Sequence, residues 1–175
     1  MDDPDIPVSL HGACVPVFGR YLRQLAAMLA LAEQHAAKQR ADPQVLLQAR
    51  LSPTMYPFAR QVEIAAGFAL RACAPLAGID TPVPADADDT FAGLQRRVAA
   101  ALAFVESLTP AQMARSAEHP VSGQAGQATI TLPAHVFLLQ YALPNFFFHV
   151  TTAYAILRHM GVGLGKRDFD GFHVY

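Results

Sequence analysis

The chain has few charged residues, only two cysteines and no tryptophan. Aspartate, glutamate, lysine and arginine together make up 15% of its 175 residues. Two isolated cysteines, Cys14 and Cys73, are too few for a disulfide framework and have no zinc-motif spacing. Both stand among apolar residues with helical spacing, so we expect buried free thiols.

The features of membrane and nucleic-acid proteins are missing as well. The sequence contains no uninterrupted apolar run of about 18 residues, so we expect no transmembrane helix and no membrane partner. The formal net charge is −1 and the basic residues are scattered, so we expect no nucleic-acid partner. The acidic N-terminus lacks the basic region of a signal peptide, which favours a cytoplasmic protein.

What the chain does have is apolar periodicity. Apolar residues make up 53% of the sequence, and helical spacing marks four long segments, residues 9–39, 57–76, 90–107 and 134–159. Four helices with one apolar face each predict an all-α four-helix bundle. We expect a single domain, 1–175, with its core at about 9–171. The long connections after the first and third helices allow topologies other than simple up-and-down.

A short stretch before the last helix has a different pattern. A glycine-containing turn signal at residues 122–126 is followed by alternating apolar and polar residues at 129–132. This pattern predicts a small β-hairpin or extended loop between the third and fourth helices.

Individual residues predict where helices begin and end. Pro16 marks either the first turn of the first helix or a kink in it. Asp88 or Asp89 can cap the third helix. Pro144 predicts a kink or a new helical start within residues 134–159, and Gly161 supplies the stop.

The candidate site consists of polar residues on apolar helix faces. Asn145 and His149 are four residues apart, on one face of a helix whose phenylalanines at 146–148 are typical of a buried segment. Gln61 lies on the apolar face of the second helix. Bundle sites are built from such side chains on facing helices, and Tyr56 and Thr152 could add hydroxyl groups. The alternative is a buried hydrogen-bond network that fixes helix register and binds no ligand.

Metal binding at this place would depend on His149. The carboxamides of Gln61 and Asn145 are weak ligands for transition metals compared with histidine and carboxylates. A zinc site needs three strong protein ligands, and only His149 is strong.

Several segments of the sequence resemble the DinB/YfiT-like superfamily, and within it the bacterial family called domain of unknown function 1993. The similarity extends over about residues 9–171. The segments that carry it are residues 49–58, 61–62, 142–158 and 161–169.

The last long helix of the superfamily commonly carries a histidine, a second histidine four residues later, and then an arginine and a glycine. His149, Arg158 and Gly161 match the second histidine, the arginine and the glycine in spacing. Asn145 stands where the first histidine would be, and Gln61 stands where relatives have a histidine on the second helix.

The resemblance implies a four-helix bundle with a pocket at Gln61, Asn145 and His149. It implies a divalent metal, Zn²⁺ or Ni²⁺, for relatives that keep three histidines, and characterised relatives include metal-dependent thiol transferases. Our leading hypothesis is therefore a DinB-like protein with a degenerate metal site that binds a small molecule. One alternative is a metal-dependent thiol transferase or hydrolase that uses His149 as its retained ligand. Another is a non-catalytic structural protein, since alanine-rich helices of low charge favour a homodimer.

Overall fold

The protein is a helical bundle with one β-hairpin, and it is described here from a computed structural model that covers residues 9–83, 88–114 and 117–174. The long helices are α1 (Leu10–Gln39), α3 (Phe58–Ala77), α4 (Phe91–Ser107) and α6 (Leu143–His159). The shorter elements are α2 (Pro43–Leu47), β1 (Pro120–Ala125), β2 (Ala128–Pro133), α5 (Ala134–Val136), the π-helix η1 (Phe137–Ala142) and α7 (Lys166–Asp170). The expected all-α bundle with a hairpin before its last long helix is confirmed.

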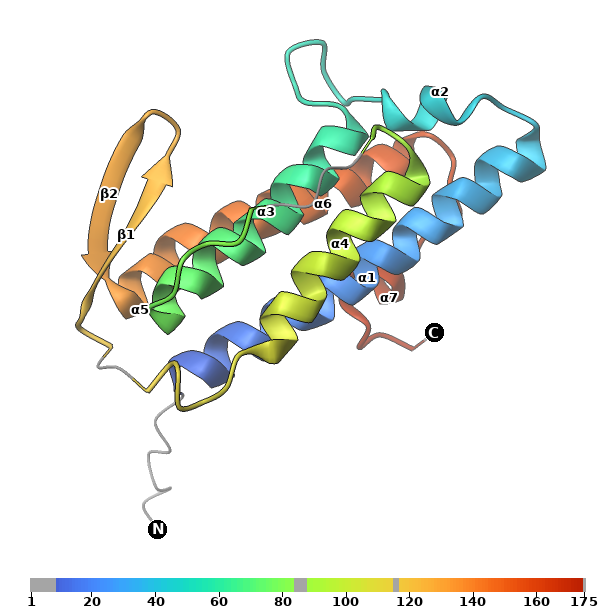
Figure 1. The fold of residues 1–175 in the computed structure, drawn as a ribbon. Helices are drawn as coiled ribbons and strands as arrows, with labels where there is room; N and C mark the ends of the chain where they lie inside the picture. Colours follow the sequence, from blue (N-terminus) through green and yellow to red (C-terminus); the bar gives the residue numbers. More distant parts are fainter. Residues whose placement is uncertain (1–8, 84–87, 115–116, 175) are drawn as a thin grey trace.

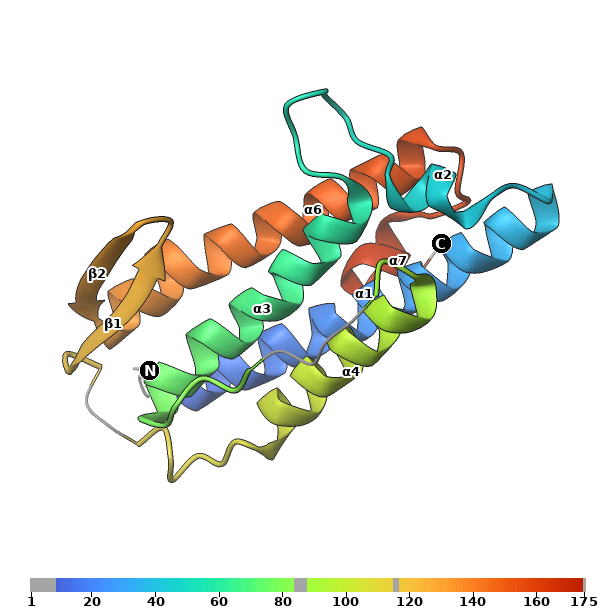
Figure 2. The same ribbon diagram turned by 45° about the horizontal axis from the view of Figure 1, so that its top comes forward.

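The four long helices are not arranged in simple up-and-down order. Figures 1 and 2 show α1 and α6 running in one direction and α3 and α4 in the other. The helices that pack most extensively are α1 with α4, α3 with α6, and α3 with α4. Because α3 and α4 are parallel neighbours, the chain between them must return along the length of the bundle. The crossover therefore follows the second long helix, and not the first or third as the connection lengths suggested.

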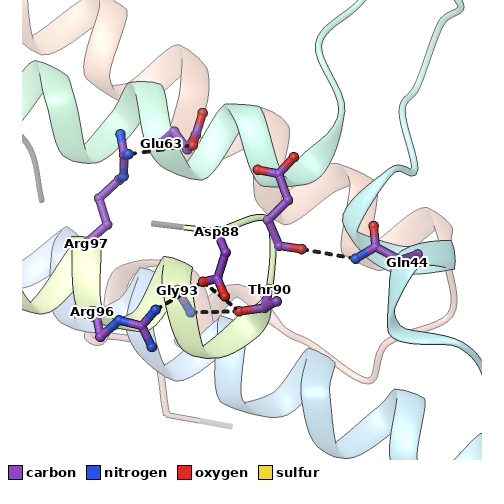
Figure 3. A network of polar contacts seen from close by, with 8 residues as sticks. Gln44, Glu63, Asp88, Thr90, Gly93, Arg96 and Arg97 are labelled. Atoms are coloured by element: carbon purple, nitrogen blue, oxygen red, sulfur yellow. Dashed lines mark hydrogen bonds and ion pairs between the residues drawn. The ribbon is translucent and has the colours of Figure 1, made fainter. Parts of the chain in front are cut away.

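The cap of α4 is Thr90, which corrects the expectation that Asp88 or Asp89 would cap this helix. The Thr90 hydroxyl accepts a hydrogen bond from the Gly93 amide and donates one to Asp88 Oδ1, both at 3.0 Å (Figure 3). Asp88 also forms an ion pair with Arg96, at 3.0 Å. Thr90 directly precedes the first helical residue, so its short side chain reaches the third amide of the helix.

Pro16 and Pro144, which the sequence marked as possible helix starts or kinks, lie at different places in their helices. Pro16 lies inside the continuous helix α1, well after its N-cap Ser9, so it does not mark the first turn. Pro144 is the second residue of α6, directly after the π-helix η1. The backbone stays right-handed helical at Ala142 and Leu143, so the helix continues through this point and does not start anew. The sequence pattern marked Pro144 but not the π-helical turns before it.

The hairpin is held against the bundle by close contact and by one hydrogen bond. A Cβ atom on Gly123 would lie 2.8 Å from the Phe137 ring, so β1 approaches η1 closely at this glycine. The Tyr141 hydroxyl donates to the Gln124 carbonyl at 2.7 Å. Gly123 and Gln124 are therefore strand residues, and the turn falls at residues 126–127 instead of 122–126.

The core lies between the four long helices and includes fully buried phenylalanines from three of these segments, Phe18, Phe58 and Phe146. The sequence pattern suggested that the phenylalanines at 146–148 are all buried. This is wrong for Phe148, which is 55% exposed. Three consecutive residues of a helix point in different directions, and only one helix face meets the core.

Cys14 on α1 and Cys73 on α3 meet inside this core as free thiols, as expected. Neither side chain is exposed, and their sulfur atoms are 3.1 Å apart. Burial, and secondarily the contact with Cys14, raises the pKa of the Cys73 thiol well above its usual value. The Cys73 thiol is accordingly protonated and unreactive in the folded protein.

The glycine-rich segment after α6 turns the chain back over the bundle. Gly161 has a φ of 82° and ends the helix, and α7 then packs against α1. The Gln24 side chain donates to the Arg167 carbonyl at 2.8 Å, which fastens the returning chain to α1. Among the described residues, no helix combines the length and apolar character that crossing a membrane requires.

Candidate functional site

The candidate site lies where α3 and α6 pack against each other, with Gln61 near the start of α3 and His149 on α6. Gln61 is 1% exposed. His149 Nδ1 is 2.7 Å from Gln61 Oε1, and Gln61 Nε2 donates to the Tyr56 carbonyl at 3.0 Å. The amide of Gln61 is therefore satisfied at both ends, which fixes the orientation of its oxygen towards the imidazole.

This hydrogen bond determines the tautomer of His149. A carboxamide oxygen only accepts hydrogen bonds, so Nδ1 of His149 must carry the hydrogen and donate. Nε2 then holds a lone pair. Nε2 makes no hydrogen bond to a described residue. It is also not among the buried side-chain atoms that lack a hydrogen-bond partner. Nε2 is therefore not fully closed off from solvent, and its lone pair is a hydrogen-bond acceptor.

The surroundings of His149 keep its imidazole neutral. Its ring stacks on Phe68, with centroids 5.8 Å apart, and meets the edge of Phe148 at 5.1 Å. Burial, and secondarily the positive charge of Arg71, lowers the pKa of His149 to about 4. The Arg71 guanidinium lies over the Phe68 ring, 4.4 Å from its centroid. At neutral pH this histidine therefore carries no charge.

Within the described part of the chain, the hydrogen bonds of the other three candidate residues go to backbone groups or to Gln61, and none of them goes to the imidazole. Asn145 Nδ2 donates to the Tyr141 carbonyl at 2.7 Å, inside its own helical segment. The Thr152 hydroxyl donates to the Phe148 carbonyl at 2.7 Å, which is the common back-bond of threonine in a helix. The Tyr56 side chain is 57% exposed, and the residue contributes its backbone carbonyl to Gln61.

Two residues near His149 were not singled out in the sequence as part of the site. Phe68 of α3 both packs in the core and stacks on the imidazole. Arg71 is the only charged residue between Gly67 and Ala77 of α3. An isolated charge among alanines was the available signal, but its proximity to His149 depends on how α3 and α6 pack.

The residues present do not fit a tightly held divalent metal. Nε2 of His149 is the only imidazole nitrogen here with a free lone pair, and the Gln61 oxygen is already engaged by the Nδ1–H group. In the part of the chain that the structure describes, no three histidine, cysteine, aspartate or glutamate side chains gather as ligands for one ion. Structural and catalytic zinc sites need at least three such ligands.

Comparisons with known proteins agree with this fold and leave the chemistry open. The family model described as "Domain of unknown function (DUF1993)" matches residues 10–170. A comparison with curated proteins gives no match. The structure is similar to the crystal structure of a DinB family member protein from Shewanella denitrificans, with a TM-score of 0.85 and 36% sequence identity, covering 95% of this chain and 94% of that one.

Proposed function

The chain belongs to the family described as "Domain of unknown function (DUF1993)", and from this premise we propose that it is a DinB-like protein that binds a small molecule at His149. The observation that carries the proposal is the 2.7 Å hydrogen bond between His149 Nδ1 and Gln61 Oε1. It holds a neutral imidazole in one tautomer and leaves Nε2 as an acceptor. Preorganisation of this kind lowers the cost of binding a ligand.

The same features favour binding over acid–base catalysis. A general base works best when its pKa lies near the operating pH. The pKa of His149 is about 4, so at neutral pH its imidazole accepts a hydrogen bond without readily taking the proton. The metal-dependent thiol transferase or hydrolase is disfavoured because only one strong ligand is present.

The ligand class follows from what surrounds Nε2. A hydrogen-bond donor, O–H or N–H, would pair with the imidazole lone pair. Phe148 is exposed beside the ring and could cover a flat apolar group by edge or face contact. We therefore expect a small molecule that combines one donor with a flat apolar body.

Nuclear magnetic resonance of His149 tests this proposal. Long-range ¹H–¹⁵N spectra should show hydrogen on Nδ1, and a pH titration should give a midpoint near 4. Because the folded pKa lies below the ordinary 6.5, the stability that His149 contributes is present above pH 6.5 and is lost as the pH falls towards 4.

Phenol and anisole serve as probes in the same experiment. Phenol should shift the Nε2 resonance of His149, and anisole, which lacks the donor, should do so far less. Thr151→Ala, on the exposed side of α6, is the matched control and should respond like the wild type. Equal responses to phenol and anisole, or one equivalent of Zn²⁺ or Ni²⁺ retained after dialysis, would contradict the proposal.

A further inference from the structure

A hollow lies between α3, α4 and residues 81–83 of the connection that joins them. Its volume is about 490 Å³, which is within the usual range for small-molecule sites. Three guanidinium groups line it, those of Arg60, Arg71 and Arg97. We call it the cationic hollow, and neither the family description nor the site at His149 accounts for it.

One end of the cationic hollow is apolar. A smaller hollow of about 110 Å³ adjoins it and shares Gly67, Leu70 and Arg97 with it. The smaller hollow adds Ala100 and Phe104 of α4 to the lining. A molecule placed here would therefore meet guanidinium groups at one end and hydrocarbon at the other.

The positive charge in the cationic hollow is not neutralised from within. Among the described residues, Glu63 is the one carboxylate in its lining, and it pairs with both Arg60, at 2.6 Å, and Arg97, at 3.8 Å (Figure 3 shows the second pair). Arg71 makes no ion pair with a described residue. It donates from Nε to the Gly67 carbonyl and stacks on Phe68. Three positive groups thus face one negative group.

Arg97 is the least exposed of the three arginines. Its side chain is only 18% exposed, and its Nε atom is buried without a hydrogen bond. Buried donors of this kind are nearly always satisfied, and leaving one unpaired costs free energy. A guanidinium group that uses one edge for a long contact with Glu63 can still offer donors to a carboxylate.

We propose that the cationic hollow binds a small organic acid, with its carboxylate held by Arg71 and Arg97 and its hydrocarbon tail directed towards Ala100 and Phe104. The charge excess selects an anion, and the apolar end selects one with a short aliphatic or aromatic body. Arginine forms paired hydrogen bonds to a carboxylate, which an uncharged amide of the same shape cannot match. The hollow shares Arg71 with the surroundings of His149, but its proposed ligand does not depend on the function proposed there.

Isothermal titration calorimetry with sodium hexanoate, hexanamide and sodium acetate tests the proposal on the full chain. Hexanoate should bind in the millimolar to high-micromolar range, with hexanamide and acetate each at least about tenfold weaker. The comparison of hexanoate with hexanamide measures the contribution of the negative charge to binding. The comparison with acetate measures the contribution of the hydrocarbon tail.

Four variants locate the binding. Arg71→Gln and Arg97→Gln should each weaken hexanoate by about tenfold or more. Arg96→Gln is the matched control: it neighbours Arg97 on α4 but is 60% exposed and turns to Asp88 instead (Figure 3), so it should bind hexanoate like the wild type. Ala100→Phe fills the apolar end and should weaken hexanoate while leaving acetate unchanged.

Each contrary result overturns the proposal. Absence of hexanoate binding at millimolar concentration, equal binding of hexanoate and hexanamide, or equal losses in Arg96→Gln and Arg97→Gln would do so. Arg97 is partly buried, so thermal melts should accompany its variant. Exposed Arg71 provides a second variant with little dependence on folding, and unchanged hexanoate affinity in Arg71→Gln would also refute the assignment.

Discussion

At the scale of single residues, Gln61 is the side chain whose position explains most about the candidate site. It is buried and satisfied at both ends of its amide, by His149 Nδ1–H and by the Tyr56 carbonyl. A buried polar residue with this bonding can fix helix register, orient a ligand group, or do both. The orientation of His149 follows from Gln61, so the two residues act as one unit.

Replacement of Gln61 by alanine should therefore lower the free energy of unfolding by about 1–3 kcal/mol, because two buried polar groups lose their partner. Urea unfolding measures this loss. Gln34→Ala, at an exposed position of α1, is the control and should change stability by less than about 0.5 kcal/mol. A loss in Gln61→Ala no larger than in the control would mean that the hydrogen bonds to Tyr56 and His149 contribute little.

At the scale of elements, the start of α4 is fixed by Thr90 and not by the aspartates before it. The Thr90 hydroxyl satisfies the Gly93 amide and is itself held by Asp88. Asp89 contributes only its backbone carbonyl, which accepts from Gln44 at 3.0 Å and so connects α4 to α2 (Figure 3). We therefore expect the side chain of Thr90 to contribute much more to the stability of α4 than the side chain of Asp89 does.

Thr90→Ala should lower the free energy of unfolding by about 1–2 kcal/mol, the usual cost of removing a helix cap. Asp89→Ala is the matched control, and it should cost less than about 0.5 kcal/mol because its side chain forms no capping bond. Chemical denaturation of both variants gives the comparison. Equal losses in the two, or a larger loss in Asp89→Ala, would show that the aspartate caps the helix after all.

The helix boundaries show which elements the apolar pattern of the sequence could predict and which it could not. The first three long helices were predicted within one residue of their ends, because a bundle helix has one continuous apolar face and that face is periodic in the sequence. The segment predicted as the fourth, residues 134–159, is divided in the structure among α5, η1 and α6, and α6 itself begins only at Leu143. The π-helix η1 was not predicted. A π-helix differs from an α-helix by one residue per turn over a few residues, and the apolar pattern of residues 137–142 does not distinguish them.

At the scale of the whole molecule, the parallel pair α3 and α4 determines where the two candidate ligand sites lie. Residues 81–83, which follow α3 in the connection to α4, complete the cationic hollow between these two helices. The site at His149 lies instead where α3 meets α6. Helix α3 therefore contributes to both candidate sites. Gln61 belongs to the site at His149, and Arg71 lines the cationic hollow and also lowers the pKa of His149.

Association of two copies through their helices remains a prediction from the alanine-rich, low-charge sequence. Size-exclusion chromatography with light scattering at micromolar concentration should give twice the chain mass of 18.9 kDa. Phe148 and Leu139 are each more than half exposed and are the first candidates for an interface. Phe148→Glu should then shift the protein towards the monomer, with Val45→Glu, also exposed but on α2, as the control. A monomer in the wild type would refute the prediction.

The sequence by itself determined the number of long helices, their buried faces and the burial of Gln61, because each depends on periodicity within one segment. It also placed Gln61 and His149 together as candidates. Only the tertiary structure decided that these two share a hydrogen bond while Asn145 bonds within its own helix, and that Arg60, Arg71 and Arg97 surround one hollow. Contacts between helices depend on their order, direction and rotation in the bundle, and no local pattern in one segment records these.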